Sequence, residues 1–155
     1  MNTNGDHYTR VISVTAQPED AYRALTTDFG AWWTTTHGGK FAEPGDRVKF
    51  TFPPLVSNWT FEARTLVRNK QVELECVAAY HVMTEQPAAP KDEWLGTRLV
   101  FNIKPSGGKT EISLTHQGLT PGLTCYEVCR MGWDTFFVDS LAQYLTSGTG
   151  KPHGQ

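Results

Sequence analysis

The amino-acid sequence predicts an α+β fold in which a curved antiparallel sheet of six to seven strands wraps around one long C-terminal helix. Three observations predict it: segments that alternate apolar and polar residues fill most of the chain, two short helical segments follow the first of them, and the longest helical pattern comes last. With 155 residues, 39% hydrophobic and 12% aromatic, the chain can bury a sizeable core. We expect a single domain over residues 1–155, with an ordered core at about 8–148.

Charge and composition disfavour several classes of partner. The formal net charge is −2 and the 14 Lys and Arg residues are scattered, which argues against nucleic acid. No apolar run approaches the roughly 20 residues that cross a bilayer, and the first ten residues lack the apolar middle of a secretion signal. We therefore expect a cytoplasmic protein that does not contact membranes. Three cysteines, an odd number, argue against a disulfide framework.

The first part of the chain predicts one strand and two short helices. Residues 8–14 alternate as a strand does. A proline at the first position and two acids in the first turn predict a helix over residues 18–25. Asp28 can cap a second short helix that carries Trp32 and Trp33. We expect one of these tryptophans to pack against the sheet and the other to face water.

Five further segments predict the rest of the sheet. Asn69 and Lys70 supply a turn, and the prolines of residues 84–92 indicate a surface loop. The Pro-Ser-Gly-Gly run at 105–108 predicts a hairpin. The segments that alternate are residues 47–52, 59–68, 72–83, 99–103 and 112–116.

The last element is a long amphipathic helix that starts at a predicted capping box of Thr124 and Glu127 and ends near Gly148. One broad stripe of this helix is apolar and should face the sheet. A third side repeats apolar residues every seven positions, and it either packs under the short helices or forms a dimer seam. That side consists of Met131, Val138 and Leu145.

This order of elements resembles the helix-grip fold of the START-like superfamily, also called SRPBCC or birch-pollen-allergen-like proteins. Within it the chain is similar to the group named after the activator of the heat-shock-protein ATPase. The resemblance covers nearly the whole chain. The residues that carry it are Pro18-Glu19-Asp20-Ala21-Tyr22-Arg23-Ala24-Leu25, Trp94-Leu95-Gly96-Thr97, Gly132-Trp133-Asp134, Leu141, Tyr144, Leu145 and Gly148.

The resemblance implies a deep cavity between the concave sheet and the long helix, used for hydrophobic ligands. The name of the group adds a link to the stress response. Inward strand phase and the apolar helix stripe indicate which side chains line such a cavity. We expect the ligand-binding residues to be Trp59, Phe61, Tyr80, Trp94, Phe101, His116, Trp133 and Phe137. The predicted function is therefore noncatalytic binding of a small hydrophobic molecule, with no cofactor.

Two other functions stay open. The first is a cyclase or aromatase-type enzyme that uses His116, which continues the inward phase of Leu114, and Tyr80, which shares the phase of Cys76. The second is a co-chaperone-like protein-interaction module that uses the third side of the long helix. That side could equally support a homodimer.

A metal site is not expected from the sequence. Cys125 and Cys129 lie one helical turn apart, but no His or acidic residue accompanies them at ligand spacing. We expect both to be buried, inert thiols. The other histidines, His37, His81 and His153 among them, show no metal-ligand spacing either.

Overall fold

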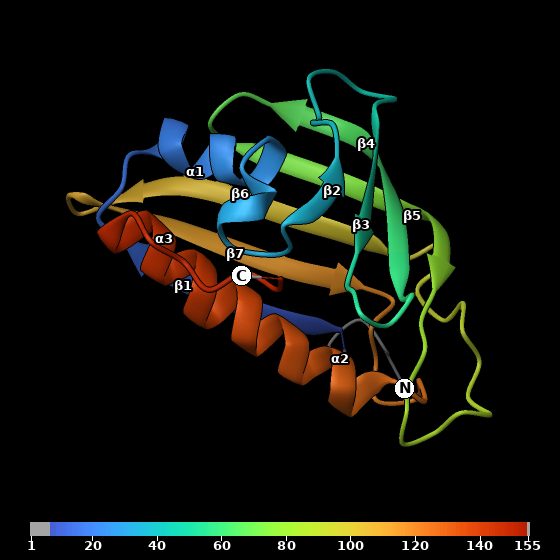
Figure 1. Cartoon of the computed structure of the whole chain (residues 1–155). Helices are drawn as coiled ribbons and strands as arrows, with labels where there is room; N and C mark the ends of the chain where they lie inside the picture. The colour runs from blue at the N-terminus through green and yellow to red at the C-terminus, as the bar shows by residue number, and fades with distance from the viewer. Residues whose placement is uncertain (1–6, 155) are drawn as a thin grey trace, which may run out of the picture.

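The structure, a computed structural model, describes residues 7–154. Its strands form one antiparallel sheet of seven strands in the order β1-β7-β6-β5-β4-β3-β2 (Figure 1). Antiparallel neighbours can be joined by tight turns, as β4 is to β5 and β6 is to β7. The strands are β1 (Tyr8–Val14), β2 (Thr36–Gly38), β3 (Arg47–Thr51), β4 (Asn58–Val67), β5 (Gln71–Tyr80), β6 (Arg98–Ser106) and β7 (Lys109–Gln117).

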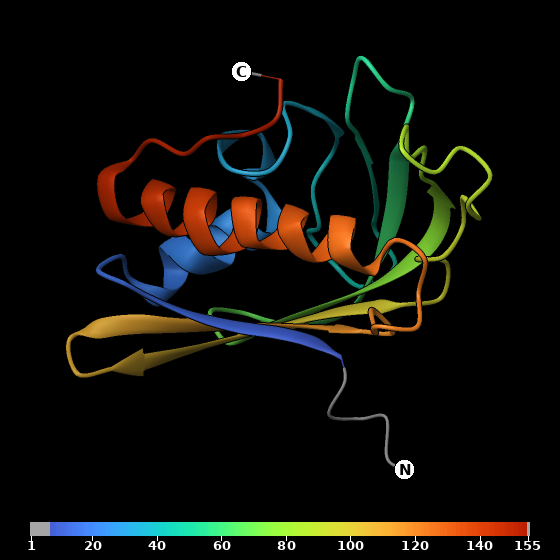
Figure 2. The same cartoon turned by 90° about the horizontal axis from the view of Figure 1, so that it is seen from below.

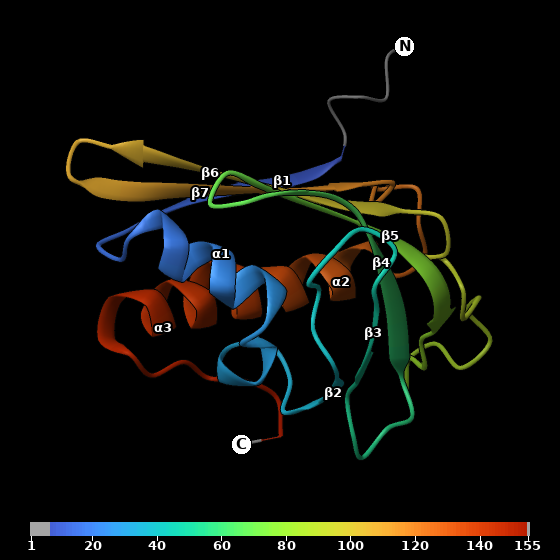
Figure 3. The same cartoon turned by 90° about the horizontal axis from the view of Figure 1, so that it is seen from above.

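The helices cover one face of this sheet. After β1 come α1 (Pro18–Thr26) and a single 3₁₀ turn, η2 (Phe29–Ala31). The long C-terminal helix consists of α2 (Tyr126–Trp133), a π-helical stretch η3 (Asp134–Leu141) and α3 (Ala142–Ser147). Figures 2 and 3 show the long helix and α1 on the same face, with the end of the sheet that carries β3 to β5 curling towards α2. The expected α+β architecture is confirmed.

The core lies between the concave face and the long helix. Alternate residues of each long strand point into it, as the period of two requires. No helix within residues 7–154 is both long and apolar enough to cross a membrane. The largest fully buried side chains include Tyr8, Phe29, Trp32, Phe50, Phe61, Phe101, Trp133 and Phe137.

The second short helix differs from the expectation. It is only the turn Phe29–Ala31, and the residues after it form the edge strand Thr36–Gly38. Trp32 and Trp33 are both buried, at 0% and 3% exposure, so the expectation that one faces water was wrong. Trp32 is satisfied in the core because its Nε1 donates to the carbonyl oxygen of Ala24 at 2.8 Å.

The start of the long helix also differs. The N-cap is Cys125, and the predicted Thr124–Glu127 capping box does not form. Instead the carboxylate of Glu93, in the loop before β6, accepts from the backbone N–H groups of Thr124 and Cys125, at 2.9 Å each. A distant carboxylate therefore satisfies the free donors that a local cap usually serves.

Candidate functional site

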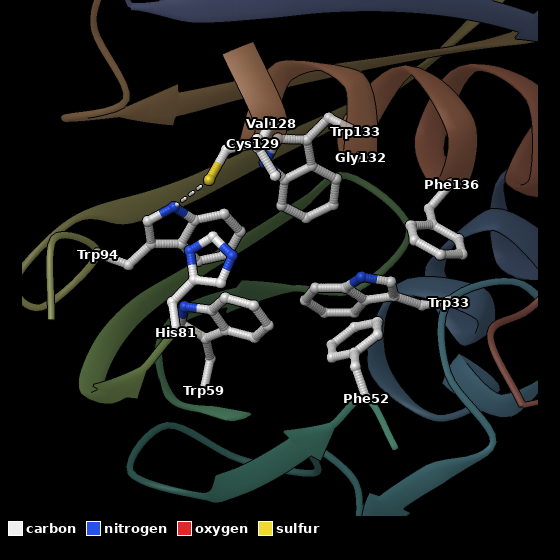
Figure 4. A pocket seen from close by; sticks show the side chains of 10 residues that line it. All are labelled: Trp33, Phe52, Trp59, His81, Trp94, Val128, Cys129, Gly132, Trp133 and Phe136. Atoms are coloured by element: carbon white, nitrogen blue, oxygen red, sulfur yellow. Dashed lines mark hydrogen bonds between the residues drawn. The ribbon is translucent and has the colours of Figure 1, made fainter. Parts of the chain in front are cut away.

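An apolar cavity of about 140 Å³ lies between α2 and the curled end of the sheet. Its side chains come from the segment after η2, the end of β3, β4, the loop between β5 and β6, and the long helix. Figure 4 shows these side chains around an open centre. The lining residues are Trp33, Phe52, Trp59, His81, Trp94, Val128, Cys129, Gly132, Trp133 and Phe136.

Packing among the indole rings holds the cavity open. The Trp94 ring centroid lies 4.8 Å from that of Trp59 and 5.9 Å from that of Trp133, and the Trp94 and Trp133 planes differ by only 8°. Trp133 also packs 5.1 Å from Trp33. Each such pair contributes about 0.5–1.5 kcal/mol beyond simple burial. Contacts among the rings thus hold these walls in place.

A second, wider cavity, the outer cavity, adjoins this inner one. This second cavity, of about 280 Å³, is lined partly by residues of the loop between β3 and β4 and of the segment after β5. It shares four lining residues with the inner cavity, so the two cavities are adjacent. The shared residues are Phe52, Trp59, His81 and Val128.

The indole nitrogen of Trp59 is a buried donor without a partner. Trp59 is 7% exposed, and its Nε1 makes no hydrogen bond with any atom of residues 7–154. A buried N–H group left unpaired costs about 1–3 kcal/mol, so most such groups in proteins are satisfied. Trp59 lines both cavities, so this unpaired donor belongs to a ring of the cavity wall.

His116 does not reach the cavity. It is 0% exposed and sits in a chain of hydrogen bonds: Trp133 Nε1 donates to His116 Nδ1 at 3.0 Å, and His116 Nε2 lies 2.9 Å from Thr97 Oγ1. Since Nδ1 accepts, the proton is on Nε2, which donates to Thr97. Thr97 Oγ1 in turn donates to the carbonyl of Trp94 at 2.6 Å. Burial lowers the pKa of His116 to about 3, with His7 adding a smaller repulsion, so the ring stays neutral.

Tyr80 points to the opposite face of the sheet from the one predicted for it. In β4–β5 pairing Phe61 faces Cys76 but Thr60 faces Ala78, so Val77 is an extra residue, a β-bulge. The bulge reverses the phase of the strand beyond it. Tyr80 is consequently 43% exposed and does not line the cavity. The expected inward position of Tyr80 was wrong.

The structure brings together only some of the predicted ligand-binding residues. Trp59, Trp94 and Trp133 line the inner cavity. Phe61, Phe101 and Phe137 are fully buried core rings, which lie outside its lining. Sequence reasoning missed the lining residues Trp33, Phe52, His81, Val128, Cys129, Gly132 and Phe136. Trp33, Phe52 and His81 follow closely after a turn or strand, and the other four lie on the long helix. Alternation within strands does not reveal such positions.

A thiol and imidazole cluster lies beside the cavity. The ligand atoms of His81, Cys125 and Cys129 lie within 4.8 Å of one another, so the fold supplies the histidine that the sequence spacing did not indicate. All three cysteines are free, and Trp94 Nε1 donates to Cys129 Sγ at 3.2 Å (Figure 4). Hydrogen bonding from Cys129, and then from His81, lowers the pKa of Cys125 to about 6, whereas that of Cys129 is raised. Both thiols are buried, as expected, at 1% and 6% exposure, and they lie next to an imidazole that the sequence spacing did not place there.

Comparison with known families gives one match. The family model described as "Activator of Hsp90 ATPase homolog 1-like protein" matches residues 15–146. No curated protein matches the chain.

Several solved structures have the same fold. The solution structure of the Aha1 dimer from Colwellia psychrerythraea is 28% identical, with a TM-score of 0.73, and the match covers 93% of this chain and 98% of that one. DynU16, a putative protein in the dynemicin biosynthetic locus, is 15% identical with a TM-score of 0.70, over 94% of this chain but 49% of DynU16. Protein MLL2253 from Mesorhizobium loti is 22% identical with a TM-score of 0.63, over 84% and 92%. The last two similarities show the fold alone.

Proposed function

The chain belongs to the family of activator of Hsp90 ATPase homolog 1-like proteins, with the helix-grip fold of the START-like superfamily, and we propose that it binds a small, flat, apolar molecule without transforming it. The observation that carries this proposal is the aromatic cavity of about 140 Å³ between α2 and the sheet. Apolar walls with a few polar groups are typical of small-molecule sites.

The size of the cavity limits the ligand. An engineered apolar cavity of about 150 Å³ stays dry and takes up benzene, so the inner cavity here fits one ring. A larger molecule would place one ring inside and extend past His81 into the outer cavity of about 280 Å³. The unpaired Trp59 Nε1 favours a ligand that carries a hydrogen-bond acceptor, such as a carbonyl or ether oxygen, next to that ring.

Binding is favoured over catalysis because of where the ionisable groups lie. The titratable lining groups of the inner cavity are His81 and Cys129. The two candidates for proton transfer, His116 and Tyr80, are respectively sealed in the core and exposed on the surface. The cyclase-type mechanism through these two residues therefore has no support in the geometry.

The acceptor preference is tested with a matched ligand pair. We expect calorimetric titration to show that acetophenone binds more tightly than ethylbenzene, since only the ketone can accept from Trp59 Nε1. A hydrogen bond of this kind contributes about 0.5–1.5 kcal/mol, or roughly threefold to tenfold in affinity. In the Trp59→Phe variant the two ligands should bind equally. Equal affinities in the wild type would remove Trp59 from the proposal.

The cavity itself is tested by filling it. Gly132 lines it, and a Cβ built there meets no atom within 4 Å, so Gly132→Leu should occupy the space and abolish binding of either ligand. Gly38, on the edge strand β2, has equally open surroundings but lies outside the cavity. Gly38→Leu should bind as the wild type does. If Gly132→Leu still binds with wild-type affinity, the ligand site lies elsewhere.

A second proposal is self-association. The relative from Colwellia psychrerythraea is a dimer, and two apolar side chains of α2, Val128 and Met131, are 44% and 59% exposed. Of the seven-residue repeat on the helix, Met131 is exposed, Val138 is partly buried and Leu145 is 8% exposed. The surface that could join two copies is therefore the α2 end of the helix and not the whole repeat.

A further inference from the structure

We propose that Cys125, Cys129 and His81 bind one Zn²⁺ ion, with the fourth coordination position open towards the aromatic cavity. This site goes beyond small-molecule binding and does not depend on it. One sulfur comes from the N-cap of α2 and the other from one turn further along the helix, and the imidazole comes from the residue that follows β5.

The spacing of the three side chains suits one ion. In a tetrahedral site with Zn–S bonds of about 2.3 Å, two sulfurs are about 3.8 Å apart. The three ligand atoms already lie within 4.8 Å of one another, so each pair needs to close by about 1 Å or less. Cys125 and Cys129 are four positions apart on the helix, which puts them on the same side, one turn apart.

The surroundings of the cluster support its sulfurs in the way that outer groups support metal ligands. Trp94 Nε1 donates to Cys129 Sγ at 3.2 Å, which stabilises negative charge on that sulfur. The neighbouring Glu93 fixes the backbone of Cys125 by accepting from its N–H at 2.9 Å. Two adjacent residues of the loop before β6, Glu93 and Trp94, therefore orient both cysteines of the site.

The donor set selects the metal. Thiolate sulfur and imidazole nitrogen favour Zn²⁺ over Ca²⁺ and Mg²⁺, which take oxygen ligands. Structural zinc sites have four protein ligands, whereas sites with three keep a position for water or another molecule. Cys129 and His81 both line the inner cavity, so the remaining position faces the space where we propose that a small molecule binds. A donor atom of that molecule, or water, completes the coordination.

The test uses the reduced, chelator-treated full chain without any added organic ligand. Titration with Co²⁺, which replaces Zn²⁺ and absorbs light, should give one ion per chain, a thiolate-to-cobalt charge-transfer band and the strong visible bands of tetrahedral cobalt. Zn²⁺ should displace it. The charge-transfer band should lose about half its intensity in Cys125→Ala and in Cys129→Ala, and His81→Ala should shift the visible bands, with weaker binding in all three variants.

Two control variants sharpen this result. Cys76 is the third free cysteine, buried on β5 and outside the cluster, so Cys76→Ala should bind cobalt as the wild type does. Trp94→Phe keeps a ring but removes the donor to Cys129, and loss of such an outer group typically costs 10–100-fold in metal affinity. We expect this variant to bind Co²⁺ about tenfold more weakly, still with one ion per chain.

If a variant fails to fold, the cobalt titration of the wild type still tests the metal site. Absence of a thiolate-to-cobalt band in the reduced wild type would overturn the metal site, and so would unchanged binding in folded Cys125→Ala and Cys129→Ala. Because no organic ligand is present in the titration, either result leaves the small-molecule proposal standing. Conversely, metal binding by a protein that takes up neither acetophenone nor ethylbenzene would support the metal site and contradict the ligand site.

Discussion

The imidazole of His116 is held neutral by the groups that enclose it. It accepts from Trp133 and donates to Thr97, so a second proton would have to displace the Trp133 N–H. The ring is also fully buried, which disfavours charge. The prediction that the His116 side chain points inward from the sheet was correct. The rings of Trp94 and Trp133 pack against it, however, and separate it from the cavity. Its role is to join β7 to the long helix.

This burial predicts a loss of stability in acid. The pKa of His116 is about 3 in the folded protein and 6.5 ordinarily. Between these values the unfolded chain binds a proton that the folded chain does not. The stability that the buried neutral imidazole contributes is therefore fully present above pH 6.5 and is lost as the pH falls towards 3. We expect the free energy of unfolding to fall by up to about 1.4 kcal/mol per pH unit in that range. Urea unfolding from about pH 7 down to about pH 4.5 measures it.

The matched variant is His116→Gln, whose amide can accept and donate but does not titrate. It should be less stable at neutral pH by about 1–3 kcal/mol, because its hydrogen bonds fit less well, and its stability should depend less on pH. His7, which disfavours a positive charge on His116, is present in both proteins, so the difference between them isolates His116. Parallel pH curves for the two proteins would contradict this account.

The start of α2 depends on a carboxylate from elsewhere in the chain. Glu93 accepts from two backbone N–H groups at that helix end, where a negative charge is also favoured by the helix dipole. We expect Glu93→Ala to lower the free energy of unfolding by about 1–2 kcal/mol. Glu127, the residue that the sequence indicated for the cap, only pairs with Arg130 on the surface. Glu127→Ala should therefore cost about 0.5 kcal/mol or less. Equal losses in chemical unfolding would be evidence against the Glu93 cap.

Local periodicity predicted the elements but not where they meet. Alternation identified β4 and β5 because each long strand has one buried face. The bulge at Val77 has no local signal, since it depends on pairing with β4, and it decided the position of Tyr80. The meeting of His81 with Cys125 likewise joins a strand end to a helix start far along the chain. Such contacts follow from the tertiary fold, whereas the spacing of residues in the sequence indicates only contacts between residues that are close in the chain.

A cavity between the sheet and the long helix was expected, but how far it extends along the helix was not predicted. The family resemblance implied one deep cavity between the concave sheet and the long helix. In the structure, rings such as Phe101 and Phe137 fill most of that space, and the cavity is confined to the end where α2 meets the curled sheet. Periodicity gives the direction of a side chain. Whether neighbouring side chains leave a void depends on their packing in three dimensions.

That same end of the molecule carries the proposed contact between two copies. We expect sedimentation to show a dimer that dissociates on dilution, and Met131→Glu to raise its dissociation constant at least about tenfold, because a charge would be buried against an apolar partner. Val11 on the edge strand β1 has the same 59% exposure as Met131 but lies on a different element, so Val11→Glu should leave the dimer intact. Were Val11→Glu to dissociate the dimer and Met131→Glu not, the two copies would pair through the β1 edge. A wild type that stays monomeric at high concentration would exclude both arrangements.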